Sequence, residues 1–169
     1  MRRALSLIAL LWFYAPAHAD DALSPEQVIA RIKVHGPGAV ALEIWSSDSQ
    51  TKALLAGVSA GNSAWLQAAK AIQPVTDGGA AEDLADALSE ALINKPYTAL
   101  PLLRQLWWKS DQEVCVFAYD SELPGGVPAY IARLERALSR TPPSQLRSLR
   151  KLCLQGISRT KQALSATPQ

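Results

Sequence analysis

The sequence predicts an all-α protein: a single domain of seven or eight short helices packed as helical hairpins, like a helical-repeat protein, and closed by one disulfide. Apolar residues recur at three- and four-residue spacing along most of the chain, which is the period of an amphipathic helix. Serine, asparagine, proline and glycine interrupt this pattern where helices would start and stop. A length of 169 residues with 49% apolar composition is enough for one domain with its own core.

The first 19 residues have the parts of a secretory signal peptide in the usual order. Arg2 and Arg3 form a short cationic start, residues 4–14 are uncharged and mostly apolar, and Ala17-His18-Ala19 matches an A-x-A cleavage site. A transmembrane helix needs about 20 apolar residues, so this run is too short to anchor the chain. We expect cleavage after Ala19, a periplasmic or secreted protein, and no transmembrane segment after the signal is removed.

The two cysteines, Cys115 and Cys153, predict one disulfide. In an oxidising compartment an isolated pair of cysteines most simply forms a bridge. The alternative is a redox-active pair, but such pairs usually have CxxC spacing and these two lie 38 residues apart. Closing a loop of this size stabilises a fold by about 4 kcal/mol on the chain-entropy model.

The domain is predicted to begin with two helices separated by a glycine–proline stop. Ser24-Pro25-Glu26-Gln27 combines a serine cap, a proline at the first helical position and a glutamine that completes a capping box. Gly36-Pro37 ends this helix, and a second helix follows up to Trp45.

Two further helices are predicted over about 49–59 and from Ser63 to just before Pro74. Gly61 closes the first of them, and the second carries apolar residues at helical spacing along one side.

A long amphipathic helix is predicted over 77–93, followed by a sixth over 96–108 with Pro101 inside it. The apolar stripe of the long helix contains Leu84, Leu88 and Ala91. Its opposite side gathers four carboxylates, which a metal or catalytic cluster would also need, but which we interpret as a solvated face. These carboxylates are Glu82, Asp83, Asp86 and Glu90.

The chain is predicted to finish with an irregular loop over 109–127 and two helices over 128–139 and 144–164. Val114-Cys115-Val116-Phe117 within the loop has the composition of a short extended piece, and Thr141-Pro142-Pro143 separates the two helices.

A shift of 34 residues superposes the third and fourth helices on the fifth and sixth. Ala53-Leu54 then matches Ala87-Leu88, Leu66 matches Leu100, and the turn at Gly61-Asn62 matches Lys95-Pro96. A period of 34 is typical of stacked helical hairpins. The alternative is coincidence between alanine- and leucine-rich helices, since the tetratricopeptide consensus is absent.

Charge is divided along the chain. Residues 20–136 carry nine basic and fifteen acidic residues, whereas residues 137–169 carry six basic residues and no acid. The last helix has a basic face formed by Arg147, Lys151 and Arg159. Such a face predicts contact with an acidic partner or a peripheral contact with anionic lipid. The alternative is that its charges face the acidic residues of 20–136 within the same molecule. The zero net charge after signal removal disfavours nucleic acid as a partner.

The motifs of common enzymes are missing. The sequence has no GxSxG, glycine-rich phosphate loop, HExxH or SxxK, and His35 is the one histidine beyond residue 19. We therefore predict no cofactor, no metal and no catalytic residues. A cell-wall-cleaving hydrolase with paired carboxylates remains the less favoured enzymatic alternative.

Aromatic residues near the loop are the candidate partner-binding residues. Trp107 and Trp108 precede the loop, and Tyr119 and Tyr130 follow within or after it. Tryptophan and tyrosine are frequent anchors of protein interfaces. The competing interpretation is that these side chains fill the core beneath the loop.

One set of residues resembles a known class of proteins. Trp45, the run Ala53-Leu54-Leu55-Ala56-Gly57-Val58, Gly61, Trp65-Leu66 and the two cysteines resemble small exported helical proteins of Gram-negative bacteria without assigned activity. The pattern is also loosely similar to periplasmic immunity proteins, which neutralise toxins of rival bacteria.

The missing catalytic motifs, the two adjacent tryptophans and the long irregular loop predict a non-catalytic protein-binding module. The resemblance implies that it is an inhibitor or immunity protein for a toxin or cell-wall enzyme. The alternative is a carrier of a small ligand or lipid, with an apolar pocket lined by Trp45, Trp65 and the leucines around residue 100.

Overall fold

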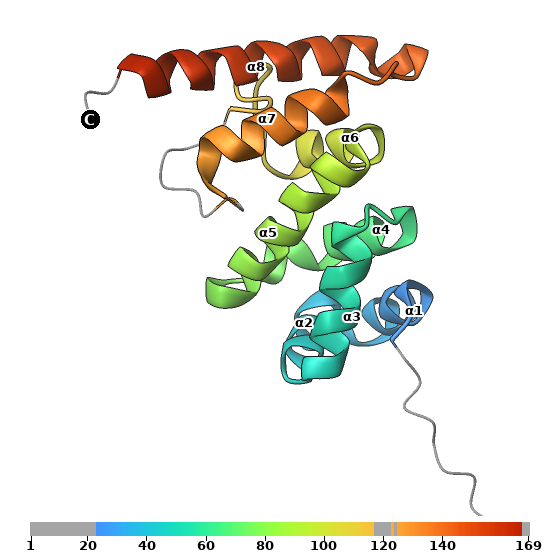
Figure 1. The fold of residues 1–169 in the computed structure, drawn as a ribbon. Coiled ribbons are helices and arrows are strands. Elements are labelled where there is room, and N and C mark those ends of the chain that lie inside the picture. Colours follow the sequence, from blue (N-terminus) through green and yellow to red (C-terminus); the bar gives the residue numbers. More distant parts are fainter. Residues whose placement is uncertain (1–22, 117–122, 124, 167–169) are drawn as a thin grey trace, which may run out of the picture.

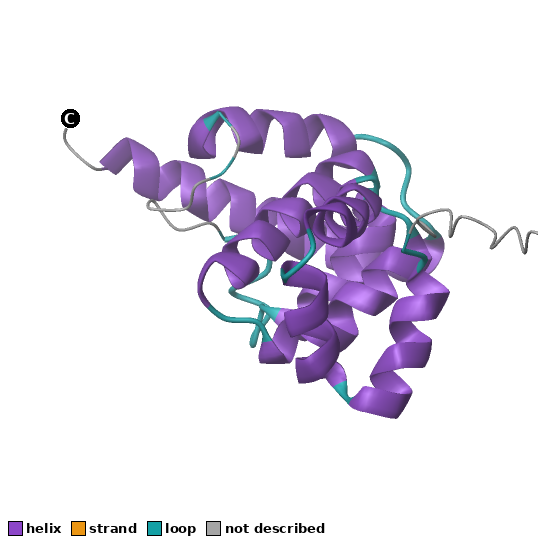
Figure 2. Cartoon of the chain, turned by 90° about the horizontal axis from the view of Figure 1, so that it is seen from below, coloured by secondary structure: helices purple, strands orange, loops and turns teal. Residues whose placement is uncertain are grey.

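A computed structural model describes residues 23–116, 123 and 125–166. This part of the chain contains eight α-helices and two short 3₁₀ turns. Helices account for all its regular structure, with no strand among these residues, as Figure 2 shows. The predicted all-α class is thus confirmed. The helices are α1 Pro25–His35, α2 Pro37–Trp45, α3 Asp48–Ser59, α4 Ser63–Ile72, α5 Gly78–Asn94, α6 Pro96–Leu106, α7 Gly126–Leu138 and α8 Arg147–Ala166, with η1 Gln73–Val75 and η2 Ser144–Leu146.

Local sequence explains where the first helices begin. The Ser24 hydroxyl accepts a hydrogen bond from the Gln27 main-chain N–H, and the Gln27 side chain accepts one from the Ser24 N–H. This reciprocal capping box satisfies two N–H groups that the helix leaves unpaired. Asn62 caps α4 in the same manner, its side chain accepting from the N–H groups of Ala64 and Trp65.

The helices stack as hairpins along one direction (Figure 1). Helices α1–α4 form one end, α5 and α6 lie in the middle, and α7 and α8 form the other end. From α3 onward, consecutive hairpins pack through equivalent helices, α3 against α5 and α5 against α7, with α4 against α6 on the second layer, whereas α1 packs against α4. This arrangement is that of a short helical-repeat protein.

Residues 34 or 35 apart in sequence are neighbours between the second and third hairpins. The Asn94 side chain donates to the Ser59 carbonyl at 2.8 Å, and the Lys70 ammonium donates to the Gln105 side chain at 2.6 Å. A Cβ on Gly61 would lie 2.5 Å from the Cβ of Lys95, so the two turns touch directly. Gly61 has φ 69°, which a glycine adopts without strain.

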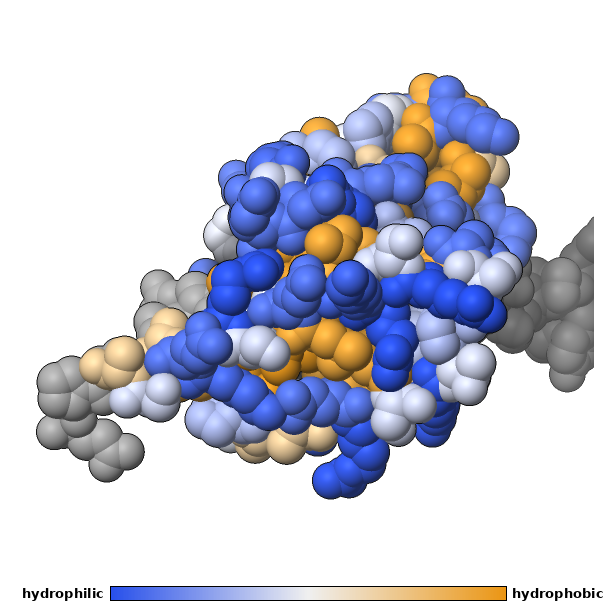
Figure 3. All heavy atoms as spheres, turned by 90° about the horizontal axis from the view of Figure 1, so that it is seen from above, coloured by the Kyte–Doolittle hydropathy of each residue, from blue (hydrophilic) through white to orange (hydrophobic). Residues whose placement is uncertain are grey.

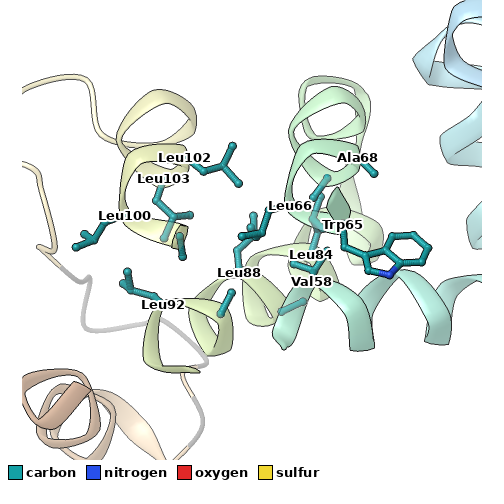
Figure 4. Packing of buried hydrophobic residues seen from close by; sticks show 14 of the residues in the cluster. Val58, Trp65, Leu66, Ala68, Leu84, Leu88, Leu92, Leu100, Leu102 and Leu103 are labelled. Atoms are coloured by element: carbon teal, nitrogen blue, oxygen red, sulfur yellow. The ribbon is translucent and has the colours of Figure 1, made fainter. Parts of the chain in front are cut away.

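The core is centred on α5 (Figure 4). Leu84, Leu88 and Leu92 lie along its inner face and are almost fully buried. Val58 of α3, Leu66 of α4 and several leucines of α6 meet them from either side. The predicted apolar stripe is thus the centre of one continuous core.

The helix α7 is tied to α5 and α6 by side chains that reach across the hairpins. The Arg133 guanidinium binds both carboxylate oxygens of Glu90, at 2.8 and 2.6 Å. The Tyr97 hydroxyl lies 3.0 Å from the Leu138 carbonyl and 2.6 Å from that of Arg140, and it donates to these acceptors at the end of α7. These bonds place the last hairpin on the core.

The helix α8 is fixed to the first part of the predicted loop. Cys115 and Cys153 form the predicted disulfide, with both cysteines fully buried. The Cys115 main chain is left-handed, with φ 54°. Residues 111–115 form turns, so the expected extended piece is wrong over Val114 and Cys115, because the chain must bend here to reach α8. Phe117 lies outside the described residues.

The predicted boundaries differ by two or more residues at the ends of three helices. The sixth helix ends at Leu106 instead of residue 108, and α7 begins at Gly126 instead of residue 128. The last helix, predicted over 144–164, is α-helical over Arg147–Ala166 and is preceded by the 3₁₀ turn Ser144–Leu146. The expected signal peptide over residues 1–19 and most of the loop after residue 116 lie outside the described residues.

Candidate functional site

Two of the four aromatic candidates are core residues. Trp108 is 8% exposed and Tyr130 is 0% exposed, so neither presents its ring as an anchor on the surface. Trp107 is half-buried and packs against the core, and Tyr119 lies outside the described residues. The competing interpretation, that these rings fill the core beneath the loop, holds for Trp108 and Tyr130.

The turn after α6 explains why Trp108 is buried. Because the helix ends at Leu106, the chain reverses over Trp107 and Trp108. The Arg104 guanidinium holds this reversal by donating to the Trp108 carbonyl and by pairing with Asp111 at 3.2 Å. The turn, and not helical periodicity, therefore sets the orientation of the two adjacent tryptophan side chains.

Tyr130 is a buried structural hydroxyl. It donates to the Ser89 carbonyl on α5 at 3.0 Å. Burial of the ring raises the pKa of Tyr130 well above its usual value, because the charged phenolate would lose its hydration. A phenol held protonated in this way links α7 to α5 and is a poor proton acceptor at neutral pH.

The predicted basic face of α8 is only partly available to a binding partner. Arg147 and Lys151 are exposed and make no hydrogen bond or ion pair within the described part of the chain. Arg159 instead donates to the Gln112 carbonyl at 2.6 Å, which holds the turn before Cys115. Among the described residues, the face therefore contains two cations without a bonding partner, Arg147 and Lys151, and one, Arg159, that holds the helix in place.

The carboxylates of α5 are spread along its outer side. Glu82, Asp83 and Asp86 are exposed, while Glu90 pairs with Arg133 at 2.6 Å. Among the described residues no group of three or more histidine, cysteine, aspartate or glutamate side chains is arranged to hold a metal ion.

A groove that the sequence did not predict lies between α1 and α4. It has a volume of about 550 Å³ and is open to solvent. Apolar side chains form most of its wall, with one carboxylate, one ammonium and one amide at its edge. The lining residues are Pro25, Glu26, Ile29, Ala30, Lys33, Val34, Ala64 and Gln67.

The walls of this groove are held in place by the packing of α1 and α4 against the core. The buried residue Val28 fixes α1 to the core, which leaves Ala30 and Val34 on the outward side. Val34 is 75% exposed, which is a high value for a large apolar side chain. On α4, the Trp65 ring covers Gly57, where a Cβ would come within 2.1 Å of the indole. This close packing holds the α4 wall rigidly.

One sequence signal points to the groove in retrospect. Val28 and Ile32 mark the buried side of the first helix, while Ala30 and Val34 fall on the opposite side at 100° per residue. Apolar residues on a side expected to face water indicate a contact surface. The α4 wall has no such signal, because Gln67 and Ala64 are ordinary surface residues.

The residues expected to line a carrier pocket pack elsewhere. Trp65, Leu100 and Leu103 belong to the core, and Trp45 packs against it. None of them lines the groove between α1 and α4.

Comparison of the chain with protein-family models, curated proteins and solved structures gives no match. Within the described residues no helix combines the length and the apolar character needed to cross a membrane. We therefore infer function from the chain's own geometry.

Proposed function

We propose that the chain is an exported, non-catalytic module that binds another protein through the groove between α1 and α4. An inhibitor or immunity protein for a toxin or a cell-wall enzyme would act in this way. Export is supported by the signal-like residues 1–19 and by the buried disulfide, which is typical of oxidising compartments.

The observation that carries the proposal is the apolar wall of the groove with Val34 at its edge. Ala30 is exposed and Val34 is 75% exposed, and these two residues lie on the same side of α1, one helical turn apart. The half-buried Ile29 lines the same groove beside them. Single exposed apolar residues are common on proteins, but a group of them within a groove marks a contact site. Covering this group with an apolar partner face would stabilise a complex.

The charged edge of the groove supports a protein partner. Glu26 and Lys33 are both exposed and lie seven residues apart on α1, which is about two helical turns. Charges at the rim of an apolar contact orient a partner more than they strengthen binding. A partner helix with apolar residues at intervals of three and four could lie in such a groove.

The experiment uses the full chain, exported from its own signal in a Gram-negative host. A photo-crosslinking amino acid replaces Val34, and crosslinked products are identified by mass spectrometry. The expected result is a defined adduct with one protein that disappears when Ala30→Asp is added, because a charge then enters the apolar wall.

A matched control separates this effect from loss of folding. Ala132→Asp places the same carboxylate at an exposed helical position on α7, outside the groove, and should leave the adduct unchanged. An adduct that survives Ala30→Asp, or no adduct at all in the presence of toxin-producing competitor cells, would overturn the proposal.

A small-ligand carrier is the second candidate, favoured by the groove volume. A volume of about 550 Å³ lies in the range of small-molecule sites. Native mass spectrometry of the purified protein would then detect a bound apolar compound, and Ala30→Asp would release it while Ala132→Asp would not.

A further inference from the structure

We propose that the outer face of α8, centred on Arg147 and Lys151, is a second docking surface for an acidic segment of a protein partner. This surface is separate from the groove on α1 and α4, so it does not depend on the function proposed for that groove. The two cations lie four residues apart and therefore one helical turn apart on the same side of α8.

The charge distribution along the chain makes this face distinctive. Residues 137–169 contain six cations and no acid, whereas residues 20–136 contain nine cations and fifteen acids. Among the residues that the structure describes, 137–166 hold six cations and no acid, whereas those up to 136 hold nine cations and eleven acids, so positive charge is concentrated at the α8 end. An acidic partner would be attracted to α8 more strongly than to the rest of the described surface.

Three of the six cations are already used to fasten α8. Arg150 donates from Nε to the Leu138 carbonyl at 2.8 Å, and Lys161 pairs with Glu135 at 2.7 Å. Arg159 donates to the Gln112 carbonyl. These three bonds hold α8 in place, but they involve neither of the other two cations on α8, Arg147 and Lys151, which are exposed. The sixth cation, Arg140, precedes α8.

The helix presents its outer face from a rigid support. Cys153 is bonded to Cys115, and Gly156 lies so close to the Val114 carbonyl that a Cβ could not fit between them. A preorganised charged face loses little conformational entropy when a partner binds.

An acidic protein segment fits this face better than a lipid surface does. The four large apolar side chains that are exposed among the described residues are Val34, Leu42, Val75 and Val116. None of them is on α8, whose large apolar side chains are buried or half-buried against the body. Binding to anionic lipid would then depend on two cations alone, which is marginal.

The face has the polar character that such docking needs. Figure 3 looks down on the α8 side and shows hydrophilic side chains over most of it, with smaller hydrophobic areas between them. Leu152 and Leu154 on α8 are half-buried, so an acidic segment could also cover apolar atoms between the cations.

The test measures binding of a fluorescein-labelled oligoglutamate peptide to the purified mature protein by fluorescence anisotropy at low salt. The double variant Arg147→Gln/Lys151→Gln should bind the peptide about tenfold more weakly, since it loses two ion pairs. The control Lys52→Gln/Lys95→Gln removes the same charge from exposed positions on α3 and at the end of α5. It should bind like the unmodified protein.

Further measurements distinguish binding at this face from a general charge effect and from other kinds of partner. Added salt should weaken binding of the peptide, and Ala30→Asp should leave it unchanged. Equal loss in both double variants would show a general charge effect and overturn the proposal. So would the absence of peptide binding, or Arg147- and Lys151-dependent binding only to vesicles containing phosphatidylglycerol, to a DNA duplex, or to a second copy of the chain.

Discussion

Gly156 on α8 contacts the main chain of Val114 so closely that a Cβ built on it would lie 1.9 Å from the Val114 carbonyl oxygen. The same Cβ would lie 2.9 Å from the carbonyl carbon of Cys115. One helical turn earlier, Cys153 makes the disulfide to Cys115. The absent side chain and the covalent bond therefore act together to hold α8 against the turn at residues 111–115.

Substitution Gly156→Ala should destabilise the fold. The new methyl group would collide with main-chain atoms, which cannot move aside as a flexible side chain can, and overpacking of this kind costs about 1–3 kcal/mol. Urea unfolding followed by circular dichroism measures the loss. Gly38→Ala on α2 is the matched control, because nothing lies within 4 Å of its Cβ position, and it should stabilise the chain by up to about 1 kcal/mol. Equal stability of the two variants would contradict the close contact between Gly156 and the main chain of Val114.

Removal of the disulfide should lower the stability strongly. The variant Cys115→Ala/Cys153→Ala opens a loop between residues 38 apart, and the chain-entropy model assigns about 4 kcal/mol to its closure. The midpoint of urea unfolding should fall accordingly, and the oxidised protein should show no free thiol by mass analysis. A midpoint within error of the unmodified protein would show that the bridge contributes nothing.

Most helix boundaries could be predicted because their signals are local. Ser24 and Gln27 form a capping box within four residues, and Gly36-Pro37 ends one helix where the next begins. Such signals act on the main chain directly, whatever the rest of the fold does. The disulfide was predictable for a different reason, since two cysteines permit one pairing.

The environment of the aromatic candidates could not be predicted from the same signals. Whether Trp107 or Trp108 faces inward depends on where α6 ends, and it ends at Leu106, two residues before the predicted end. Arg104, which binds the Trp108 carbonyl and Asp111, sets this turn through contacts made only in the folded chain. The groove was missed because its two walls come from separate helices.

Truncation of Trp108 should therefore affect stability before it affects binding. Trp108→Ala removes a ring that is 8% exposed, and such deletions cost about 3–5 kcal/mol. Trp107→Ala is the comparison, and its half-buried ring predicts a smaller loss. Thermal unfolding of both variants decides the point: a Trp108→Ala protein that melts like the unmodified chain would place this ring outside the core.

The hydroxyl of Tyr130 should give the fold a specific sensitivity to alkaline pH. In the folded chain, burial of the ring raises the pKa of Tyr130, while in the unfolded chain it titrates near the ordinary value of about 10. Above pH 10 the unfolded chain thus releases a proton that the folded chain keeps, so stability falls as pH rises. Below pH 10 both states are protonated and this contribution is fully present.

Comparison of Tyr130→Phe with the unmodified chain isolates this effect. At pH 7 the variant should be less stable by about 1 kcal/mol, because it loses the hydrogen bond to the Ser89 carbonyl. Above pH 10 the unmodified chain should lose a further 1.4 kcal/mol per pH unit, approximately, relative to the variant. The two curves of unfolding free energy against pH, measured in urea, should therefore converge near pH 11. Parallel curves up to that pH would mean that Tyr130 ionises as readily in the folded chain as in the unfolded one, and that its ring is reached by water.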